Sequence, residues 1–192
     1  MCVASTLCYD GHMSVVAKAL LALLLSLPRY KADTETVEER TQRLTIVSVA
    51  IDRAAQRATC SGEYEVEGCT RVWSKSAREL RMALVTAGTF ESHFAQHIHE
   101  GNCKPYECDF GRAHSPWQLH RSRFISDEDW VAMHASTQSA TDLAAWHATG
   151  ALARASGCPG NVGMFSRYMS GGSCIWKGGA PRAAFYEKLL KR

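Results

Sequence analysis

The stretch LRMALVTAGTFES, residues 80–92, holds the most informative helical pattern of the chain. Leu80, Leu84 and Ala87 follow one another at intervals of four and three residues, which places them on one face of an α-helix. Glu91 comes four residues after Ala87 and continues that face. The pattern predicts a core helix over residues 73–90, with Glu91 at the inner end of its apolar stripe.

A carboxylate in that position has chemical consequences. Burial of a carboxylate costs free energy unless the group is paired or protonated, so burial raises its pKa. A general acid that works near neutral pH needs such a raised pKa. Glu91 is therefore the candidate general acid. The alternative is an ordinary glutamate at a helix end that extends into solvent.

Helical patterns continue on both sides of this stretch. Upstream, apolar residues recur at helical spacing from Leu44 to Ala58, and Thr36 with Glu39 resembles a capping box that starts this helix. Downstream, three further helices are predicted over residues 139–155, 159–169 and 181–191. The last two begin with a proline, which the first turn of a helix tolerates.

The segment between these helices is irregular. Glycines and prolines interrupt residues 98–116, which predicts a small β-hairpin or a stapled loop. The predicted fold class is therefore mostly α, with one irregular insert.

The cysteines are arranged in local pairs. The chain has 8 cysteines, and besides Cys2 and Cys8 they form three pairs, at positions 60 and 69, 103 and 108, and 158 and 174. Each pair brackets a loop-like stretch, as short disulfide staples do in proteins exposed to oxidising conditions. Free thiols in a cytosolic chain are the alternative. Zinc is less favoured, because no Cys-x2-Cys element is present.

The N-terminal region contains an apolar stretch from Val15 to Leu27, which ends at Pro28. A helix that spans a bilayer needs roughly 20 apolar residues, so no stable membrane span is expected. We favour a buried N-terminal helix over a signal segment, because the positive residues that open a signal peptide are missing. Residues 1–30 are then the N-terminal apolar segment, and residues 31–192 are one catalytic domain.

The charge of the chain restricts its partners. The formal net charge is +3, and lysines and arginines form no long runs. This weakly basic balance is not typical of a nucleic-acid partner and favours an anionic polymer over a cationic one. The lysines and arginines are interpreted as solvated helix faces. No cofactor and no oligomeric state are indicated.

Three short elements occur in a characteristic order: Glu91-Ser92, then Ser115-Pro116-Trp117-Gln118, then Tyr168-Met169-Ser170-Gly171. In this order they resemble the lytic transglycosylase and goose-type lysozyme superfamily, in which Glu-Ser ends a helix. Gly-Leu-Met-Gln and Tyr-Asn-Ala-Gly motifs follow in that superfamily. The resemblance covers roughly residues 75–190. Three positions of the second element and the asparagine of the third depart from the pattern.

The resemblance implies a lysozyme-like fold and cleavage of the β-1,4 bond between N-acetylmuramic acid and N-acetylglucosamine in peptidoglycan glycan strands. Glu91 would be the general acid/base. A lytic transglycosylase, the preferred activity, needs only this carboxylate, because the C6 hydroxyl of the sugar closes a 1,6-anhydro ring. A lysozyme of the inverting type needs a second carboxylate roughly 6.5–9.5 Å away. Asp109 is the candidate, and Glu107 is a second option. The alternative for Asp109 is an Asx-turn before Gly111.

The same resemblance suggests substrate contacts for Ser92, Gln118, His120 and Tyr168. The alternatives are a helix cap for Ser92, a loop hydrogen bond for Gln118 and a core position for Tyr168. Trp117 is expected to be a core aromatic residue rather than a sugar platform. Five histidines lie between residues 93 and 120, but their spacing matches no known zinc hydrolase, so no metal site is predicted. The cluster is expected at the surface or facing the substrate.

Two other classes of protein remain as alternatives. One is a non-catalytic module that binds cell wall or forms part of a phage particle, because the second and third elements depart from the pattern. The other is a disulfide-rich metal protein. The expected location is extracytoplasmic, in the periplasm or in a phage virion.

Overall fold

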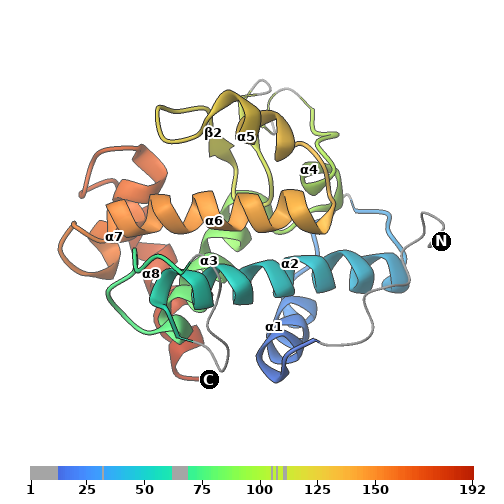
Figure 1. Ribbon diagram of the computed structural model, residues 1–192, viewed down its shortest axis with the longest axis horizontal. Coiled ribbons are helices and arrows are strands. Elements are labelled where there is room, and N and C mark those ends of the chain that lie inside the picture. The colour runs from blue at the N-terminus through green and yellow to red at the C-terminus, as the bar shows by residue number, and fades with distance from the viewer. Residues whose placement is uncertain (1–12, 32, 62–68, 105, 107, 110–111) are drawn as a thin grey trace.

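The computed structural model describes residues 13–31, 33–61, 69–104, 106, 108–109 and 112–192, and these are mostly helical with one small antiparallel sheet (Figure 1). Cys2, Cys8, Glu107 and Gly111 lie outside the described residues. The elements in chain order are α1 (Val15–Ser26), α2 (Val37–Thr59), α3 (Ala77–Ser92), α4 (Gln96–His99), β1 (Ala113–His114), β2 (Leu119–His120), α5 (Asp127–Ala132), α6 (Gln138–Ala155), α7 (Gly160–Ser170) and α8 (Gly179–Leu190).

Helix α2 lies at the centre of the fold. The predicted capping box is confirmed: Glu39 N donates to Thr36 Oγ1 over 3.2 Å, and Thr36 N donates to Glu39 Oε2 over 2.7 Å. Along its length α2 packs against α1 on one side and α6 on the other, and α2 and α6 run side by side (Figure 1). Helix α1 contributes Leu20 and Leu24 to the shared core.

Helix α3 contains the stripe that the sequence predicted. Leu80, Leu84 and Ala87 are all buried in the core, where α3 contacts α2, α6 and α8. The helix begins at Ala77 and not at residue 73, because Ser76 and Glu79 form a second capping box. It continues through Ser92. The next residue, His93, adopts a left-handed conformation and ends the helix.

The irregular insert contains both of the expected features. Strands β1 and β2 pair antiparallel, with Ala113 opposite His120, and the Cys103–Cys108 disulfide lies just before them. The residues that join the strands are 115–118, so the Ser-Pro-Trp-Gln element is the hairpin loop itself. Ser115 and Gln118 both have positive φ, at 69° and 47°, which side-chain-bearing residues rarely adopt.

The three predicted disulfides are confirmed, between Cys60 and Cys69, Cys103 and Cys108, and Cys158 and Cys174. Such staples are typical of proteins that fold in an oxidising compartment, outside the reducing cytosol. Among the helices of the described residues, none combines the length and the apolar character that crossing a bilayer requires.

Candidate active site

One cleft brings several of the predicted residues together. It has a volume of about 580 Å³ and is formed by the end of α3, the β1–β2 hairpin, the segment after β2, and helices α6 and α7. Glu91, Gln118, His120 and Tyr168 all line it. These residues come from three separate parts of the chain, so the fold assembles a site that the sequence could only suggest.

Glu91 lies in this cleft with its side chain 11% exposed. Burial raises the pKa of Glu91 to about 7, and the positive charge of Arg182 opposes part of that increase. The carboxyl group is therefore poised between its protonated and ionised forms near neutral pH. Among the described residues that line the cleft, Glu91 is the only carboxylate.

Arg182 is the partner of Glu91 and comes from α8. Its Nη2 donates to Glu91 Oε1 over 3.4 Å, and its Nη1 donates to the carbonyl of Gly178 over 2.9 Å. The guanidinium also lies over the rings of Phe90, at 4.9 Å, and Trp176, at 5.4 Å. Because these contacts fix the guanidinium, a positive charge is held beside the Glu91 carboxylate.

Ser92 is placed differently from the residues around it. It is 2% exposed, its hydroxyl donates to the carbonyl of Pro116 over 2.7 Å, and Phe94 N donates to it over 3.1 Å. It is not among the residues that line the cleft. Its contacts tie the end of α3 to the hairpin loop, so Ser92 fixes the backbone that follows Glu91.

A hydrogen bond joins α7 to the hairpin loop at the site. Tyr168 Oη donates to the carbonyl of Trp117 over 3.3 Å, and burial, followed by the negative charge of Glu91, raises the pKa of Tyr168 well above 10. Tyr168 thus keeps its proton and remains a donor. Trp117 is buried and its Nε1 donates to the carbonyl of Leu84 over 3.0 Å, as expected of a core aromatic residue. Gln118 Nε2 lies 3.6 Å from Cys108 Sγ.

Asp109 and His120 form a pair near the cleft. His120 Nδ1 lies 3.8 Å from Asp109 Oδ2, and the two side chains are 57% and 51% exposed. His120 lines the cleft, whereas Asp109 is not among the lining residues. Asp109 has a positive φ of 45°. The structure therefore places the candidate second carboxylate in solvent, beside a residue of the cleft rather than inside it.

The histidines that precede the hairpin do not share one environment. His99 is buried, its Nε2 lies 2.9 Å from Thr141 Oγ1, and burial lowers its pKa to about 3. The expectation that this cluster lies at the surface is wrong for His99, because α4 turns it toward α6. Among the described residues, no group of three His, Cys, Asp or Glu side chains is arranged to hold a metal ion.

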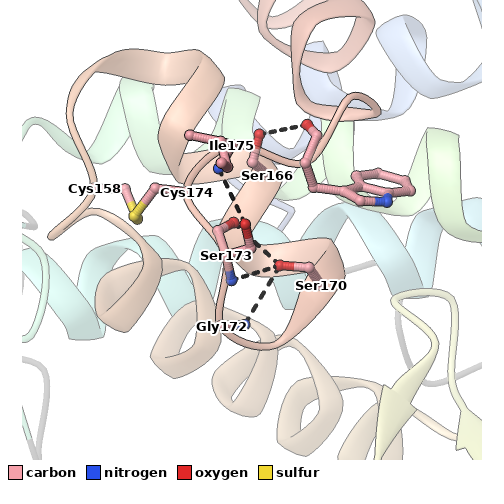
Figure 2. The surroundings of a disulfide bond; sticks show 8 residues. Cys158, Ser166, Ser170, Gly172, Ser173, Cys174 and Ile175 are labelled. Carbon is pink, nitrogen blue, oxygen red and sulfur yellow. Dashed lines mark hydrogen bonds between the residues drawn. A yellow bond between two sulfur atoms is a disulfide. The ribbon is translucent and has the colours of Figure 1, made fainter.

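The end of α7 and the start of the loop that leads to α8 border the site. Ser170 and Gly171 line the cleft, and the Cys158–Cys174 disulfide anchors the loop to the start of α7 (Figure 2). Ser173 N donates to Ser170 Oγ over 2.8 Å, and Ser166 Oγ donates to the carbonyl of Trp176 over 2.8 Å (Figure 2). The same loop supplies the Gly178 carbonyl and the Trp176 ring that hold Arg182.

Sequence reasoning missed the basic residues of the cleft. Arg123, Arg154 and Arg167 line it together with Phe124 and His147. Arg123 and Arg154 are exposed, in agreement with the interpretation of the arginines as solvated residues, but that interpretation did not predict that these three, from three separate elements, line one cleft. The sequence signal that was available is Arg123-Phe124, a cation beside an aromatic residue in a loop.

No protein-family model matches the chain, and no curated protein and no solved structure is significantly similar to it. The functional assignment therefore depends on the geometry and chemistry of the cleft itself.

Proposed function

We propose that this protein is a glycosidase that cleaves the β-1,4 bond between N-acetylmuramic acid and N-acetylglucosamine in peptidoglycan, and that it acts as a lytic transglycosylase. The observation that supports this most is Glu91: a carboxyl group with a pKa of about 7 inside a cleft of about 580 Å³. A glycosidic bond needs a proton donor of this kind at its leaving oxygen.

The chemistry requires one carboxyl group in two protonation states. Protonated Glu91 donates its proton to the glycosidic oxygen as the C1–O bond breaks and positive charge develops at the sugar ring. The carboxylate left behind then takes the proton of the C6 hydroxyl while the C6 oxygen bonds to C1, which closes a 1,6-anhydro ring and restores protonated Glu91. Arg182 stabilises the carboxylate between the two transfers, because its guanidinium is 3.4 Å away.

Three further residues have roles in this proposal. The side-chain amide of Gln118 both donates and accepts, which suits an N-acetyl or hydroxyl group of the bound sugar. Tyr168 holds the carbonyl of Trp117 and so fixes the loop that presents Gln118. His120, exposed at the cleft on β2, is a further substrate contact two residues after Gln118.

A lysozyme-type hydrolase is the second candidate. One observation favours it: the Asp109 carboxylate lies beside His120, which lines the cleft, so Asp109 is the nearest candidate to activate a water molecule. The transglycosylase is preferred because it needs no second carboxylate. Peptidoglycan lies outside the cytoplasmic membrane, so the disulfides agree with a periplasmic protein or a component of a phage particle.

The products of digestion distinguish these possibilities. Purified peptidoglycan is incubated with wild type and Asp109→Asn, and the released muropeptides are identified by mass spectrometry. We expect 1,6-anhydro ends, with the Asp109→Asn rate within about threefold of wild type. Reducing ends, with a loss of about 100-fold or more in Asp109→Asn, would establish a hydrolase instead. No release from several wall types would leave only a non-catalytic wall-binding module.

A further inference from the structure

The cleft carries three arginines that the reaction itself does not use. Arg123 comes from the segment between β2 and α5, Arg154 from the last turns of α6 and Arg167 from α7. Each belongs to a different element, yet all three line the same cleft as Glu91. We name Arg123, Arg154 and Arg167 the arginine wall.

No carboxylate of the described residues neutralises the arginine wall. None of the ion pairs found among those residues includes Arg123, Arg154 or Arg167. Two acidic side chains of α5 have other partners, since Asp127 pairs with Arg121, and Asp129 accepts from His147 over 2.9 Å. Within the described part of the chain, the positive charge of the arginine wall is thus not neutralised by an ion pair and is available to an anionic ligand.

Two of these arginines are held in place by one aromatic ring. The guanidinium carbon of Arg154 lies 4.0 Å from the ring centre of Phe124, and that of Arg123 lies 4.9 Å from it. The two cations are close enough to repel each other, since burial and then the charge of Arg123 lower the pKa of Arg154. Stacking leaves the N–H edges of a guanidinium available, and those edges match a carboxylate.

We propose that the arginine wall binds a carboxylate on the lactyl branch of muramic acid, either the free lactyl carboxylate or a carboxylate of the stem peptide attached there. This rests on the proposed function, because it assigns a substrate group to the same cleft. An anion at the arginine wall removes the repulsion between Arg123 and Arg154. Neutral polymers of N-acetylglucosamine have the same backbone but lack the branch, so the arginine wall makes the cleft selective for peptidoglycan.

Binding to a charged and a neutral ligand tests this. The full chain carrying Glu91→Gln, which cannot turn the ligand over, is titrated with soluble peptidoglycan fragments and with the hexamer of N-acetylglucosamine. Adding either Arg123→Gln or Arg154→Gln should weaken binding of the peptidoglycan fragments about tenfold. Either substitution should also make that binding less dependent on salt concentration. Binding of the neutral hexamer should change less than about twofold. The proposal would be overturned if these substitutions weakened binding of both ligands equally, or if they weakened binding of neither.

A matched arginine controls for loss of a stacked side chain. Arg57 lies 4.0 Å over the Trp146 ring on α6 but does not line the cleft, so Arg57→Gln should leave both affinities unchanged. A loss of peptidoglycan affinity in Arg57→Gln equal to that in Arg154→Gln would show a general charge effect and would also overturn the proposal.

Two further arms separate the sources of the carboxylate and the two levels of the argument. Fragments stripped of stem peptides keep only the lactyl carboxylate, so arginine-dependent binding that survives stripping assigns that group, and binding lost on stripping assigns the peptide. Cleavage by the chain with Glu91 intact is measured separately. If it cleaves nothing while arginine-dependent binding persists, the proposed function fails and the arginine wall stands. If it cleaves and binding ignores the arginines, only the arginine wall fails.

Discussion

At the scale of single residues, Glu91 shows how a catalytic group opposes stability. Its pKa is about 7 in the folded protein and near 4.5 in an unfolded chain, so the folded state holds the proton more tightly. The resulting stabilisation is complete below about pH 4.5 and is lost as the pH rises through 7. The wild type should therefore lose about 3 kcal/mol of unfolding free energy relative to Glu91→Gln between about pH 4 and pH 8. Denaturant unfolding of both proteins at the two pH values measures this. If wild type and Glu91→Gln lost the same unfolding free energy between the two pH values, the prediction would be contradicted.

Arg182 is a positioning residue whose effect is visible in a pH profile. Protonated Glu91 is the active acid, so kcat/KM should fall as the pH rises above about 7. Arg182 lowers the pKa of Glu91, so Arg182→Gln should move this alkaline limb to higher pH and also reduce kcat. Arg182→Lys, which keeps the charge, should restore part of the wild-type profile. An unchanged limb in Arg182→Gln would mean that Arg182 acts only in packing.

At the scale of elements, sequence patterns predicted the long helices and missed the short ones. The stripe of α3 and the capping box of α2 are local signals, and both are confirmed by the buried positions and cap hydrogen bonds. Helix α5 has six residues and none of them is buried, so it has no apolar period to recognise. The start of α3 was misplaced because Trp73 is buried in the core without being helical.

The contact between α7 and α8 depends on one glycine. A Cβ atom at Gly179 would lie 2.1 Å from Ser166 Oγ and 2.4 Å from the Val162 carbonyl, so α8 could not stay at this distance. Gly179→Ala should cost about 1–3 kcal/mol of unfolding free energy and displace Arg182, three residues later. Gly172→Ala is the control, because its Cβ would meet nothing within 4 Å. Equal unfolding temperatures for the two variants would contradict this packing.

At the scale of the whole molecule, the site depends on contacts that no local pattern reveals. Glu91 and Arg182 are 91 residues apart, and the arginine wall comes from three elements. Motif order pointed to Glu91, Gln118, His120 and Tyr168, which do line one cleft. Charge alone did not point to the arginines. An isolated arginine in the sequence does not reveal whether the fold will place it at a cleft or elsewhere on the surface.

The disulfide between Cys158 and Cys174 should stabilise both the fold and the site. It closes a segment with a sequence separation of 16, so replacing both cysteines by serine should cost about 2–4 kcal/mol. The loop it anchors also holds Arg182, so activity measured well below the unfolding temperature should fall as well. Replacing Cys60 and Cys69, neither of which lines the cleft, should lower stability while sparing activity. Equal activity losses in the two double variants would contradict a specific link between this loop and the site.

The central claim is that Glu91 is the general acid/base of a glycan-cleaving enzyme, and turnover by Glu91→Gln tests it most directly. The rate of muropeptide release from purified peptidoglycan is compared for wild type, Glu91→Gln and Glu128→Gln, with unfolding temperatures as the check on folding. Glu128 is exposed on α5 and outside the cleft lining, so its variant should keep wild-type activity. We predict a loss of at least about 100-fold in Glu91→Gln with the fold intact. Release by a folded Glu91→Gln at the wild-type rate would contradict the claim.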